Sequence, residues 1–296
     1  MPSRRGVLAR SRKGLKVAGT IAVGLDIGAT NVRAAAVDLR RGEIKGKVAR
    51  ARLFDEEHRR LIEELAQRGF PENSPDLPPE EARALLDHSL ENVISCVEAV
   101  LDASVSGVGI GCAGPVDPCA GVVGPDAQVL PPNMYGWCRV PVAAIISRRF
   151  GVESRVNGDV RVMALAEFLF GAGRGCDTFV LIAPGTGLGC GIIEEGRLKD
   201  GCYHTAGEIW KTAVKRKDRF GVRRLDYYGA IEGIARIFLE NWELLEKRPA
   251  YSLGEAFAGG VSAKSVTGAA GDPGHPAHEL ARKAVLDYGR TLARGL

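Results

Sequence analysis

Near the N-terminus, a carboxylate is followed closely by a glycine turn, in the sequence Asp26-Leu-Ile-Gly28-Ala29-Thr30-Asn31. Glycine lets backbone N–H groups approach a phosphate closely, and Thr30 adds a hydroxyl donor. Asp26 could hold Mg²⁺ beside the phosphates, directly or through water. We therefore predict that Asp26 and the turn Gly28 to Asn31 bind a nucleotide. A plain hairpin with Asp and Asn as turn residues is the competing interpretation.

A second glycine turn has the same character, in the sequence Gly185-Thr186-Gly187-Leu-Gly189-Cys-Gly191. Alternating glycines leave backbone N–H groups open to an incoming phosphate. A bulged hairpin is the competing interpretation of this turn alone. Two such turns, each closing a hairpin of apolar strands, favour phosphate binding, and we predict nucleotide contacts from Gly185, Thr186 and Gly187.

Other nucleotide motifs fail on inspection. Gly109-Ile-Gly111-Cys-Ala-Gly114 matches G-x-G-x-x-G after an expected strand, but Pro115-Val-Asp-Pro118 follows and cannot open the helix that a Rossmann site requires. The chain also contains no G-x-x-x-x-G-K-[ST] sequence. The sequence therefore excludes a Rossmann site at this loop and a P-loop.

Asp159 is a candidate general base. It lies between an expected strand at 152–156 and an expected helix at 160–170, so its carboxylate would sit at a helix N-terminus. The helix dipole favours an ionised carboxylate there, which could accept the proton of an attacking hydroxyl. An ordinary Asp N-cap is the structural alternative, and the two roles are compatible.

Runs of apolar and β-branched residues separated by turn residues place these motifs on an α/β framework. We expect an antiparallel three-stranded meander at 21–27, 32–39 and 43–51, and a second hairpin at 178–195. Further strands are expected at 105–111 and 152–156. Helices are expected at 55–68, 79–103, 142–150, 160–170, 225–245 and 277–293. Because the strand–glycine-turn–strand hairpin occurs twice, we expect two lobes.

Composition excludes several classes of protein. Of 296 residues, 45% are hydrophobic and 26% are charged, which is typical of globular chains. No apolar run is long enough for a membrane span, and the first 20 residues lack the apolar stretch of a signal peptide. Seven scattered cysteines without a C-x-x-C pair predict reduced thiols, neither a disulfide framework nor a zinc site.

The formal net charge of +4 comes from the start of the chain. Residues 1–20 contain six basic residues and no acidic residue, so residues 21–296 have a formal net charge of −2. The body of the protein therefore offers no charge-based case for a nucleic-acid surface.

Together these stretches resemble motifs of the repressor–ORF–kinase (ROK) family of sugar kinases, in order and with similar spacing from about residue 21 to residue 296. The first phosphate motif, the sugar loop, the catalytic segment, the second phosphate loop and the sugar-clamping motif of that family correspond to 26–33, 109–137, 159–175, 185–191 and Thr205-Ala-Gly-Glu208.

The resemblance implies an actin-like ATPase (ribonuclease H-like) α/β fold with two lobes around a cleft. A disordered basic extension is expected at 1–20, a small lobe at 21–123 and a larger lobe at 124–296. The implied activity is ATP-dependent and uses Mg²⁺: a cytoplasmic, glucokinase-like kinase for a hexose or N-acetylhexosamine. Neither a membrane nor a nucleic acid is an expected partner, and a homo-oligomer such as a dimer is compatible with the sequence.

The resemblance also implies roles for individual residues. Asp159 would be the general base, and the small-molecule sugar would be bound by polar groups that donate and accept in fixed directions. The expected sugar contacts are Asn133, Gly158, Glu208 and Asp226.

Several positions depart from the family pattern. The expected Asn before the catalytic Asp is Gly158, the expected sugar-site His is Lys211, and the expected Glu is Asp226. The cysteine-rich zinc loop of those relatives is replaced by the basic run 215–224, so we expect no zinc. We interpret this run as a solvated loop, with a clamp for an acidic ligand as the alternative.

These departures leave two other functions open: a catalytically degenerate sugar- or nucleotide-binding protein, and a kinase for another small metabolite. A DNA-binding repressor is disfavoured, because a 20-residue basic segment cannot form the helical DNA-binding domain of the family's repressors. Family members continue past the last helix with a strand and a Gly-Gly turn that contacts adenosine. We therefore expect the 124–296 lobe to be incomplete at its C-terminus and this chain to bind ATP weakly.

Overall fold

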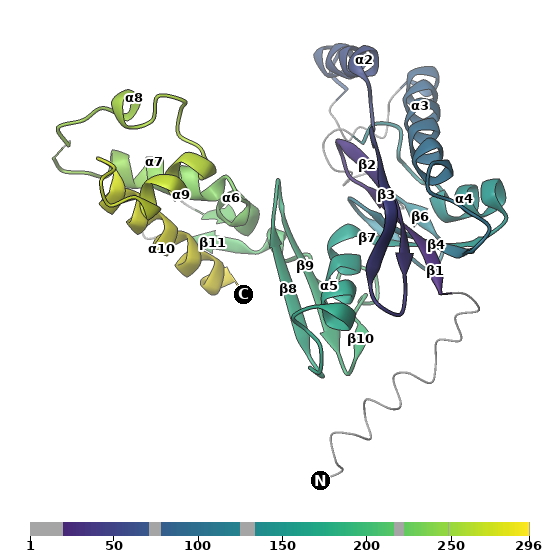
Figure 1. Cartoon of the computed structure of the whole chain (residues 1–296). Helices are drawn as coiled ribbons and strands as arrows, with labels where there is room; N and C mark the ends of the chain where they lie inside the picture. Colours follow the sequence, from purple (N-terminus) through teal and green to yellow (C-terminus); the bar gives the residue numbers. More distant parts are fainter. Residues whose placement is uncertain (1–19, 71–77, 125–133, 216–221, 248, 296) are drawn as a thin grey trace, which may run out of the picture. The chain divides into compact units, whose positions relative to one another are not determined.

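The computed structural model describes residues 20–70, 78–124, 134–215, 222–247 and 249–295 (Figure 1). Its contacts divide the chain into two compact units. Unit 1 consists of Met1–Leu181 and Gly191–Ala206, and unit 2 consists of Ile182–Cys190 and Gly207–Leu296. Each unit is described by itself.

A five-stranded mixed sheet forms the centre of unit 1, with the strand order β3-β2-β1-β4-β7. Its strands are β1 (Ile21–Ile27), β2 (Asn31–Asp38), β3 (Glu43–Arg52), β4 (Val105–Cys112) and β7 (Glu153–Gly158). The first three form the predicted antiparallel meander, and β4 pairs in parallel with both β1 and β7. The meander and the two later strands are therefore confirmed.

Alternation along β1 shows why these residues form a strand with one buried face. Val23, Leu25 and Ile27 are buried, whereas Gly24 and Asp26 between them are exposed. Successive side chains of a strand point to opposite faces, so this pattern aims Asp26 away from the apolar core.

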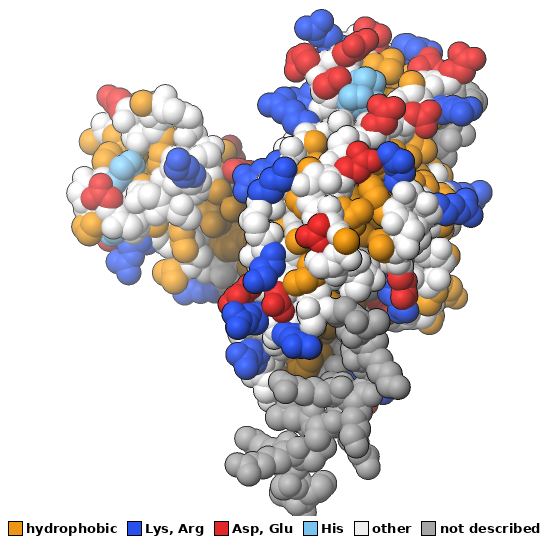
Figure 2. All heavy atoms as spheres, turned by 45° about the vertical axis from the view of Figure 1, so that its right-hand side comes forward, with side chains coloured by type: hydrophobic (Ala, Val, Ile, Leu, Met, Phe, Trp, Pro, Cys, Tyr) orange, Lys and Arg blue, Asp and Glu red, His pale blue; other side chains and the backbone are white. Residues whose placement is uncertain are grey.

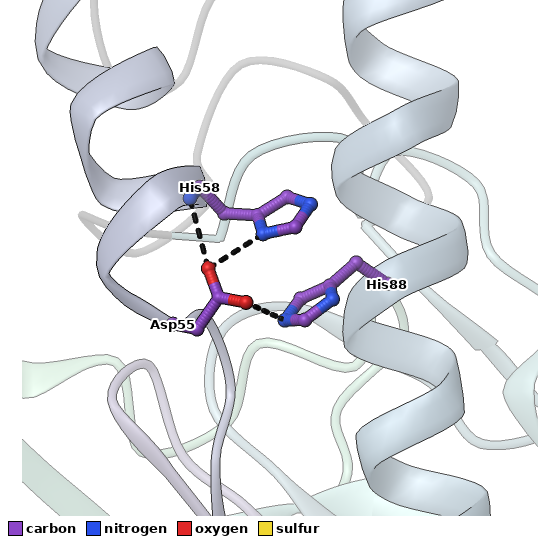
Figure 3. Close-up of side chains that lie close together, drawn as sticks. All are labelled: Asp55, His58 and His88. Carbon is purple, nitrogen blue, oxygen red and sulfur yellow. Dashed lines mark hydrogen bonds and ion pairs between the residues drawn. The ribbon is translucent and has the colours of Figure 1, made fainter.

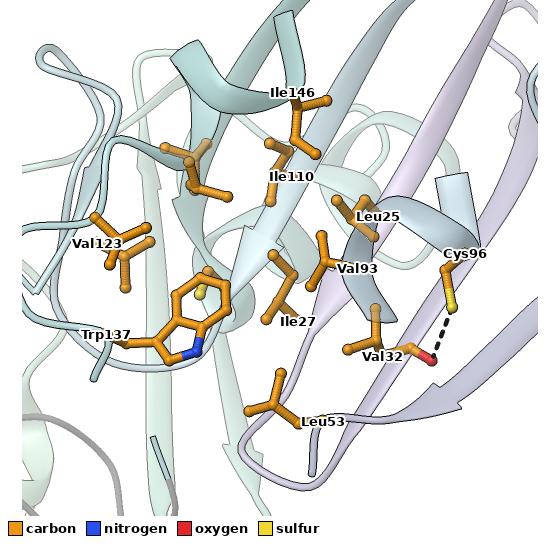
Figure 4. Packing of buried hydrophobic residues seen from close by; sticks show 14 of the residues in the cluster. Leu25, Ile27, Val32, Leu53, Val93, Cys96, Ile110, Val123, Trp137 and Ile146 are labelled. Carbon is orange, nitrogen blue, oxygen red and sulfur yellow. Dashed lines mark hydrogen bonds between the residues drawn. The ribbon is translucent and has the colours of Figure 1, made fainter. Parts of the chain in front are cut away.

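Helices cover the sheet of unit 1: α2 (Glu56–Gln67), α3 (Pro79–Glu98), α4 (Val142–Phe150) and α5 (Asp159–Phe170). α3 packs on β1, β2 and β3, and α4 packs on β4 and β7. Their apolar side chains form one core with the sheet, which holds Ile27, Val93, Ile110 and Ile146 (Figure 4). α5 also packs on β4 and β7, where it lies against Gly111 rather than Ile110 and so covers the opposite face.

Trp137 anchors the segment before α4 to the core of unit 1 and to α3. Its side chain is fully buried in the core of unit 1 (Figure 4). Its indole Nε1 donates to Ser89 Oγ at 2.9 Å, and Ser89 Oγ donates to the carbonyl of Leu86 at 2.9 Å. The one polar atom of the indole is thus satisfied inside an apolar core. A short hairpin, formed by β5 (Val116–Asp117) and β6 (Val122–Val123), precedes Trp137 in the sequence.

The chain passes from unit 1 into unit 2 within β8 (Phe179–Pro184) and returns within β9 (Leu188–Glu194). These strands and β10 (Arg197–Leu198) form a three-stranded sheet in the order β10-β9-β8. The second predicted hairpin is confirmed, but its turn is shorter than expected, because Gly189 and Gly191 already belong to β9.

The rest of unit 2 is mainly helical. It contains the short helix η2 (Ile209–Lys211) and an antiparallel pair, β11 (Ala213–Lys215) with β12 (Val222–Arg224). The helices that follow are α6 (Leu225–Gly229), α7 (Gly233–Glu243), α8 (Leu253–Ala256), α9 (Ala263–Gly271) and α10 (His278–Gly295). α10 packs against α7 and α9 around Phe238, Val266 and Ala281.

The single helix predicted at 225–245 is wrong, because the chain turns between α6 and α7. Gly233 marks the turn: a Cβ at this position would lie 1.8 Å from the carbonyl oxygen of Tyr228. Backbone therefore passes too close for any side chain, and a new helix starts there. The last predicted helix is confirmed as α10.

The predicted domain boundaries differ from the division of the chain into two units by contacts. The expected extension at 1–20 lies almost entirely outside the described residues. The lobes expected at 21–123 and 124–296 stay a prediction; the division by contacts falls elsewhere because β7 extends the sheet of unit 1. Within the described part of the chain, every helix is too short or too polar to cross a membrane.

Candidate functional site

Two carboxylates lie at the same edge of the sheet of unit 1. Asp26, near the end of β1, pairs in register with Gly111 of β4, and Gly111 pairs with Asn157 of β7. Asp159 follows directly after β7 ends at Gly158. The carboxyl ends of neighbouring parallel strands are where open α/β sheets bind ligands. The structure thus brings the predicted base Asp159 and the predicted phosphate-site residue Asp26 to the two sides of β4.

The electrostatics of this end of the sheet involve both carboxylates. Partial burial raises the pKa of Asp26, and the Arg33 guanidinium, 3.6 Å from Oδ2, acts in the lowering direction. Cys112 is fully buried at the end of β4, and burial together with the charges of Asp159 and Asp26 raises the pKa of its thiol strongly. The thiol between the carboxylates therefore stays protonated at neutral pH.

Asp159 is the first residue of α5 and not its N-cap, which is Gly158. The capping interpretation of Asp159 is therefore wrong. Its Oδ1 accepts a hydrogen bond from the N–H of Val160 at 2.7 Å. The carboxylate still lies in the first turn, where the helix dipole and free N–H groups favour negative charge.

The first glycine turn connects β1 and β2 without a left-handed residue. Gly28 N–H donates to the carbonyl of Asn31 at 2.9 Å, and a Cβ on Gly28 would lie 3.2 Å from that oxygen. Ala29 and Thr30 line a pocket of about 300 Å³ with Phe54, Ile62 and Tyr135, among others. Tyr135 belongs to the predicted sugar loop, so the structure brings the end of that loop beside the phosphate turn.

A buried arginine holds the loop that leads to the predicted sugar clamp. Arg161 on α5 is 7% exposed, and its Nη1 lies 3.2 Å from Asp200 Oδ1. Its Nη2 donates to the carbonyl oxygens of His204 and Ala206 and to that of Asp200. Asn157 reaches the same carboxylate, with Nδ2 donating to Asp200 Oδ1 at 3.4 Å.

Sequence reasoning missed Arg161. A charged residue inside the apolar run Val160-Arg-Val-Met-Ala-Leu-Ala166 was the available signal, because a buried charge needs partners elsewhere in the fold. The partners themselves lie about 40 residues further along the chain and follow no local pattern.

The same loop contacts the predicted sugar-loop region of unit 1. His204 Nε2 lies 3.5 Å from Asp117 Oδ1, and His204 has a left-handed backbone with φ +56°. Non-glycine residues adopt this conformation rarely, so the surrounding contacts must hold it.

The second glycine turn belongs to unit 2. Gly185 N–H donates to the carbonyl of Gly187 at 2.8 Å, and the carbonyl of Gly185 accepts from Ile231 N–H at 2.9 Å. A Cβ on Gly187 would meet no atom within 4 Å. The turn therefore has open space beside it, and its base is tied to the segment between α6 and α7.

Two other glycines of these motifs are explained by close packing. Gly191 lies against α5, where a Cβ would be 2.4 Å from Ala164 Cβ. Gly207 has φ +88°, and a Cβ there would be 2.3 Å from the carbonyl oxygen of Cys190. Each position requires glycine for the fold, independently of any ligand.

An aromatic and basic cluster in unit 2 joins two predicted sugar contacts. Glu208 accepts a hydrogen bond from Trp210 Nε1. Lys211 Nζ and Arg224 Cζ each lie 5.0 Å from the centre of the Trp210 ring. Arg224 also pairs with Asp226 at 3.2 Å. The structure therefore brings Glu208 and Asp226 into one cluster, in which Lys211 occupies the position where the family pattern has histidine.

One carboxylate oxygen of Asp226 is placed to accept a hydrogen bond from a ligand. Its Oδ1 is buried, and within the described residues it has no hydrogen-bond partner. Of the remaining predicted positions, Asn133 lies outside the described residues, as does most of the basic run 215–224. The described ends of that run form the β11–β12 pair.

A family model described as the ROK family matches residues 22–221. The chain belongs to the ROK family. The sequence is 34% identical over 151 residues to a putative fructokinase of Bacillus subtilis, covering 50% of this chain and 48% of the relative. It is 34% identical over 136 residues to a glucokinase of Thermotoga maritima, covering 44% and 41%. The matched part thus spans about half the length of these relatives or less.

Repressors of the family are also similar to this chain. It is 29% identical over 143 residues to the N-acetylglucosamine repressor of Escherichia coli, covering 46% of this chain and 33% of the repressor.

Solved structures give the fold. A ROK family glucokinase from Streptomyces griseus, in complex with glucose and AMPPNP, matches with a TM-score of 0.58 and 24% identity, covering 93% of this chain and 76% of that one. A ROK family transcriptional regulator, a homologue of the E. coli MLC protein, matches with a TM-score of 0.66 and 20% identity, covering 99% and 66%. The predicted actin-like α/β fold is confirmed, and so is the resemblance to ROK proteins.

Proposed function

We propose that this ROK protein is an ATP-dependent sugar kinase that phosphorylates a hexose or an N-acetylhexosamine. The observation that carries the proposal is the pair of carboxylates, Asp26 and Asp159, at the carboxyl ends of strands on either side of β4. The sequence similarity to a fructokinase and a glucokinase supports it.

Phosphoryl transfer to a sugar needs a base for the hydroxyl proton and neutralisation of phosphate charge. Asp159 would accept the proton of the attacking hydroxyl on its carboxylate. A position in the first turn of a helix favours the negative charge that a general base needs.

Asp26 fits a magnesium ion, because an anionic oxygen ligand with a half-exposed side chain leaves room for water in the coordination sphere. Magnesium, when bound with ATP, would neutralise phosphate charge beside the turn Gly28 to Asn31. The turn Gly185 to Gly187 offers further backbone N–H groups to the nucleotide.

The sugar would be bound by Asn133, Glu208, Asp226 and the backbone of Gly158. Asp226 supports this role through its buried Oδ1, which can accept a hydrogen bond from a sugar hydroxyl. Because Gly158 has no side chain where the family pattern has Asn, one sugar contact is reduced to backbone groups.

A screen for sugar-dependent ADP release tests the proposal. Purified protein is incubated with Mg-ATP and each of the common hexoses and N-acetylhexosamines in turn, with a heat-inactivated sample as the control. Turnover with one group of sugars is expected. Sugar or nucleotide binding by calorimetry without any turnover would contradict the kinase.

A non-catalytic sugar- or nucleotide-binding protein is the second candidate. The similarity to the N-acetylglucosamine repressor and to a transcriptional regulator favours it. A kinase for an acidic small metabolite is the third, and the cations Lys211 and Arg224, each 5.0 Å from the centre of the Trp210 ring, favour it. Adding sugar acids and other carboxylated acceptors to the same screen separates the third candidate from the first.

A further inference from the structure

Two histidines and an aspartate meet between α2 and α3 in unit 1 (Figure 3). Asp55 precedes α2, His58 lies in its first turn, and His88 projects from α3. His58 Nδ1 lies 2.7 Å from Asp55 Oδ1, and His88 Nε2 lies 3.5 Å from Asp55 Oδ2. One ligand atom from each residue falls within 4.8 Å of the other two. We call these three residues the two-histidine cluster.

The carboxylate of Asp55 is held so that its two oxygens have different tasks. Oδ1 accepts the backbone N–H of His58 at 2.9 Å and thereby caps α2. Oδ2 faces His88 (Figure 3). The helix cap therefore orients the carboxylate and leaves one oxygen directed at the second histidine.

The surroundings favour a cation. Helices α2 and α3 together carry nine carboxylates and only three arginines, not counting Asp55. Figure 2 shows both acidic and basic side chains around a histidine at the top of unit 1. His58 and His88 are each 21% exposed, so an ion from solvent can reach the cluster without unfolding. Surplus negative charge raises the local concentration of cations.

We propose that Asp55, His58 and His88 form a binding site for a late first-row divalent metal ion of the Zn²⁺ type. Two imidazoles and one carboxylate suit Zn²⁺, Co²⁺ and Ni²⁺, whereas Mg²⁺ and Ca²⁺ prefer oxygen ligands. With three protein ligands, water completes the coordination, and the ion exchanges with solvent.

Binding needs a small side-chain rearrangement. The two imidazole rings are stacked, with centres 3.7 Å apart and planes inclined by 14°. A metal ion lies in the plane of each imidazole that binds it, so two parallel rings cannot share one ion. One ring must rotate about its Cβ–Cγ bond, and this torsion is broad and easily changed. To bind the ion through Nε2, His88 must also lose its contact with Asn92 Nδ2, which lies 3.0 Å from that nitrogen.

The site links two elements that lie beside the phosphate turn. Asn92 Nδ2 also contacts the carbonyl of Leu53 at 3.3 Å, and Leu53 N–H donates to the carbonyl of Thr30 at 2.9 Å. Metal binding at His88 therefore changes the partners of Asn92, which is the first residue of a hydrogen-bonded path to Thr30. Its expected structural effect is a higher melting temperature of the protein, since it binds the folded cluster only.

Calorimetric titration of the full chain with ZnCl₂, after removal of metal with a chelator, tests the site. One equivalent of Zn²⁺ is expected to bind. Co²⁺ is expected to give visible absorption bands typical of a site with nitrogen ligands, and Mg²⁺ is expected not to compete. Loss of an outer-shell partner typically weakens metal binding 10–100-fold, so loss of a ligand in His88→Ala should weaken it by about 100-fold or more.

Matched variants keep the test independent of folding. Asp55→Asn retains a helix-capping side chain, so it should fold like the parent. Because it loses the anionic carboxylate ligand, it should bind Zn²⁺ more weakly than the parent. His278→Ala is the control, because His278 lies on α10 and contacts the carbonyl of Ala269, away from the two-histidine cluster. The affinity of this variant for Zn²⁺ should equal that of the parent. Melting curves in chelator report the folding of each variant.

The chain offers one clear rival location. Asp117, Cys119 and His204 form the other group of three ligand-bearing side chains in the described parts of unit 1. If His204→Ala abolished Zn²⁺ binding while His88→Ala left it unchanged, the ion would belong there and the proposal would be overturned. Absence of Zn²⁺ binding by the folded parent protein would overturn it as well. Neither result depends on whether the protein is a kinase.

Discussion

At the scale of single residues, Asp159 and Asp26 share one edge of a sheet but serve different tasks. Asp159 lies in the first turn of α5, whose dipole favours the ionised carboxylate. Asp26 lies where burial disfavours the same ionised form. Two carboxylates with different environments can divide the labour of proton transfer and charge neutralisation.

Replacing Asp159 by Asn should abolish most of the turnover while leaving sugar affinity close to that of the parent. The amide keeps the shape but cannot accept the proton, and general base catalysis contributes about 10²–10⁴-fold. Steady-state kinetics and calorimetry with the sugar found in the ADP-release screen measure both quantities. Glu153→Gln, at the far end of β7, is the matched control with unchanged turnover. If turnover fell by less than about tenfold, Asp159 would have only a structural role.

Asp26→Asn should lower turnover by about 100-fold or more without destabilising the protein. Burial raises the pKa of Asp26 above its unfolded value, so the folded state disfavours the charged form at neutral pH. Stability linked to this group therefore rises as pH falls through the folded pKa, and at pH 7 the Asn variant should be as stable as the parent or slightly more stable. Because Asp26 is half exposed and Arg33 offsets the effect, the difference should stay below about 1 kcal/mol.

Urea unfolding at pH 7 and pH 3 checks this sign. Any stability advantage of Asp26→Asn should shrink at the lower pH, where the parent carboxyl takes up its proton. A variant that is clearly less stable than the parent at pH 7 would mean that Asp26 stabilises the fold, in conflict with the burial argument.

At the scale of elements, one buried side chain joins α5 to the loop before the sugar-clamping motif. Arg161→Met removes the guanidinium donors to Asp200 and to the carbonyls of His204 and Ala206, while it keeps the length of the side chain. We expect a loss of about 2–4 kcal/mol in the free energy of unfolding, because buried acceptors remain without donors. Denaturant unfolding measures the loss.

A second measurement separates loosening of the loop from general destabilisation. Limited proteolysis of Arg161→Met should cut within residues 200–206 before the rest of the chain is cleaved. Arg155→Met, an exposed arginine on β7, should change stability by no more than about 0.5 kcal/mol. Equal stability of Arg161→Met and Arg155→Met would show that the buried contacts contribute nothing.

Elements were predictable where local pattern decides them. The meander, β4, β7 and α10 follow from apolar periodicity and turn residues. The break between α6 and α7 was missed, because the close approach of the Tyr228 carbonyl to Gly233 is a packing fact without a local signal. α9 was missed as well, since the run Ala263–Gly271 is short and rich in Ala and Gly, with a weak apolar pattern.

At the scale of the whole molecule, the family and its fold could be read from spaced motifs, whereas contacts between distant residues could not. Asp26 and Asp159 were identified from their positions at strand ends. The two-histidine cluster was not, because His58 and His88 are 30 residues apart and meet only after α2 and α3 pack. Glu208 and Asp226 were expected as sugar contacts, but Trp210 and Arg224, which connect them, follow no motif.

The metal content of the whole protein gives the last prediction. The basic run 215–224, which replaces the cysteine-rich zinc loop of the family pattern, contains neither cysteine nor histidine. Structural zinc sites are closed by four Cys or His ligands, and a site without thiolates in this loop cannot retain zinc against a chelator. We therefore expect less than about 0.1 equivalents of zinc in chelator-washed protein by elemental analysis. Zinc that is added back should bind reversibly at Asp55, His58 and His88, as three protein ligands and water allow. Stoichiometric zinc after the chelator wash would contradict this and would point to Cys119, Cys202 and His204 as the structural ligands.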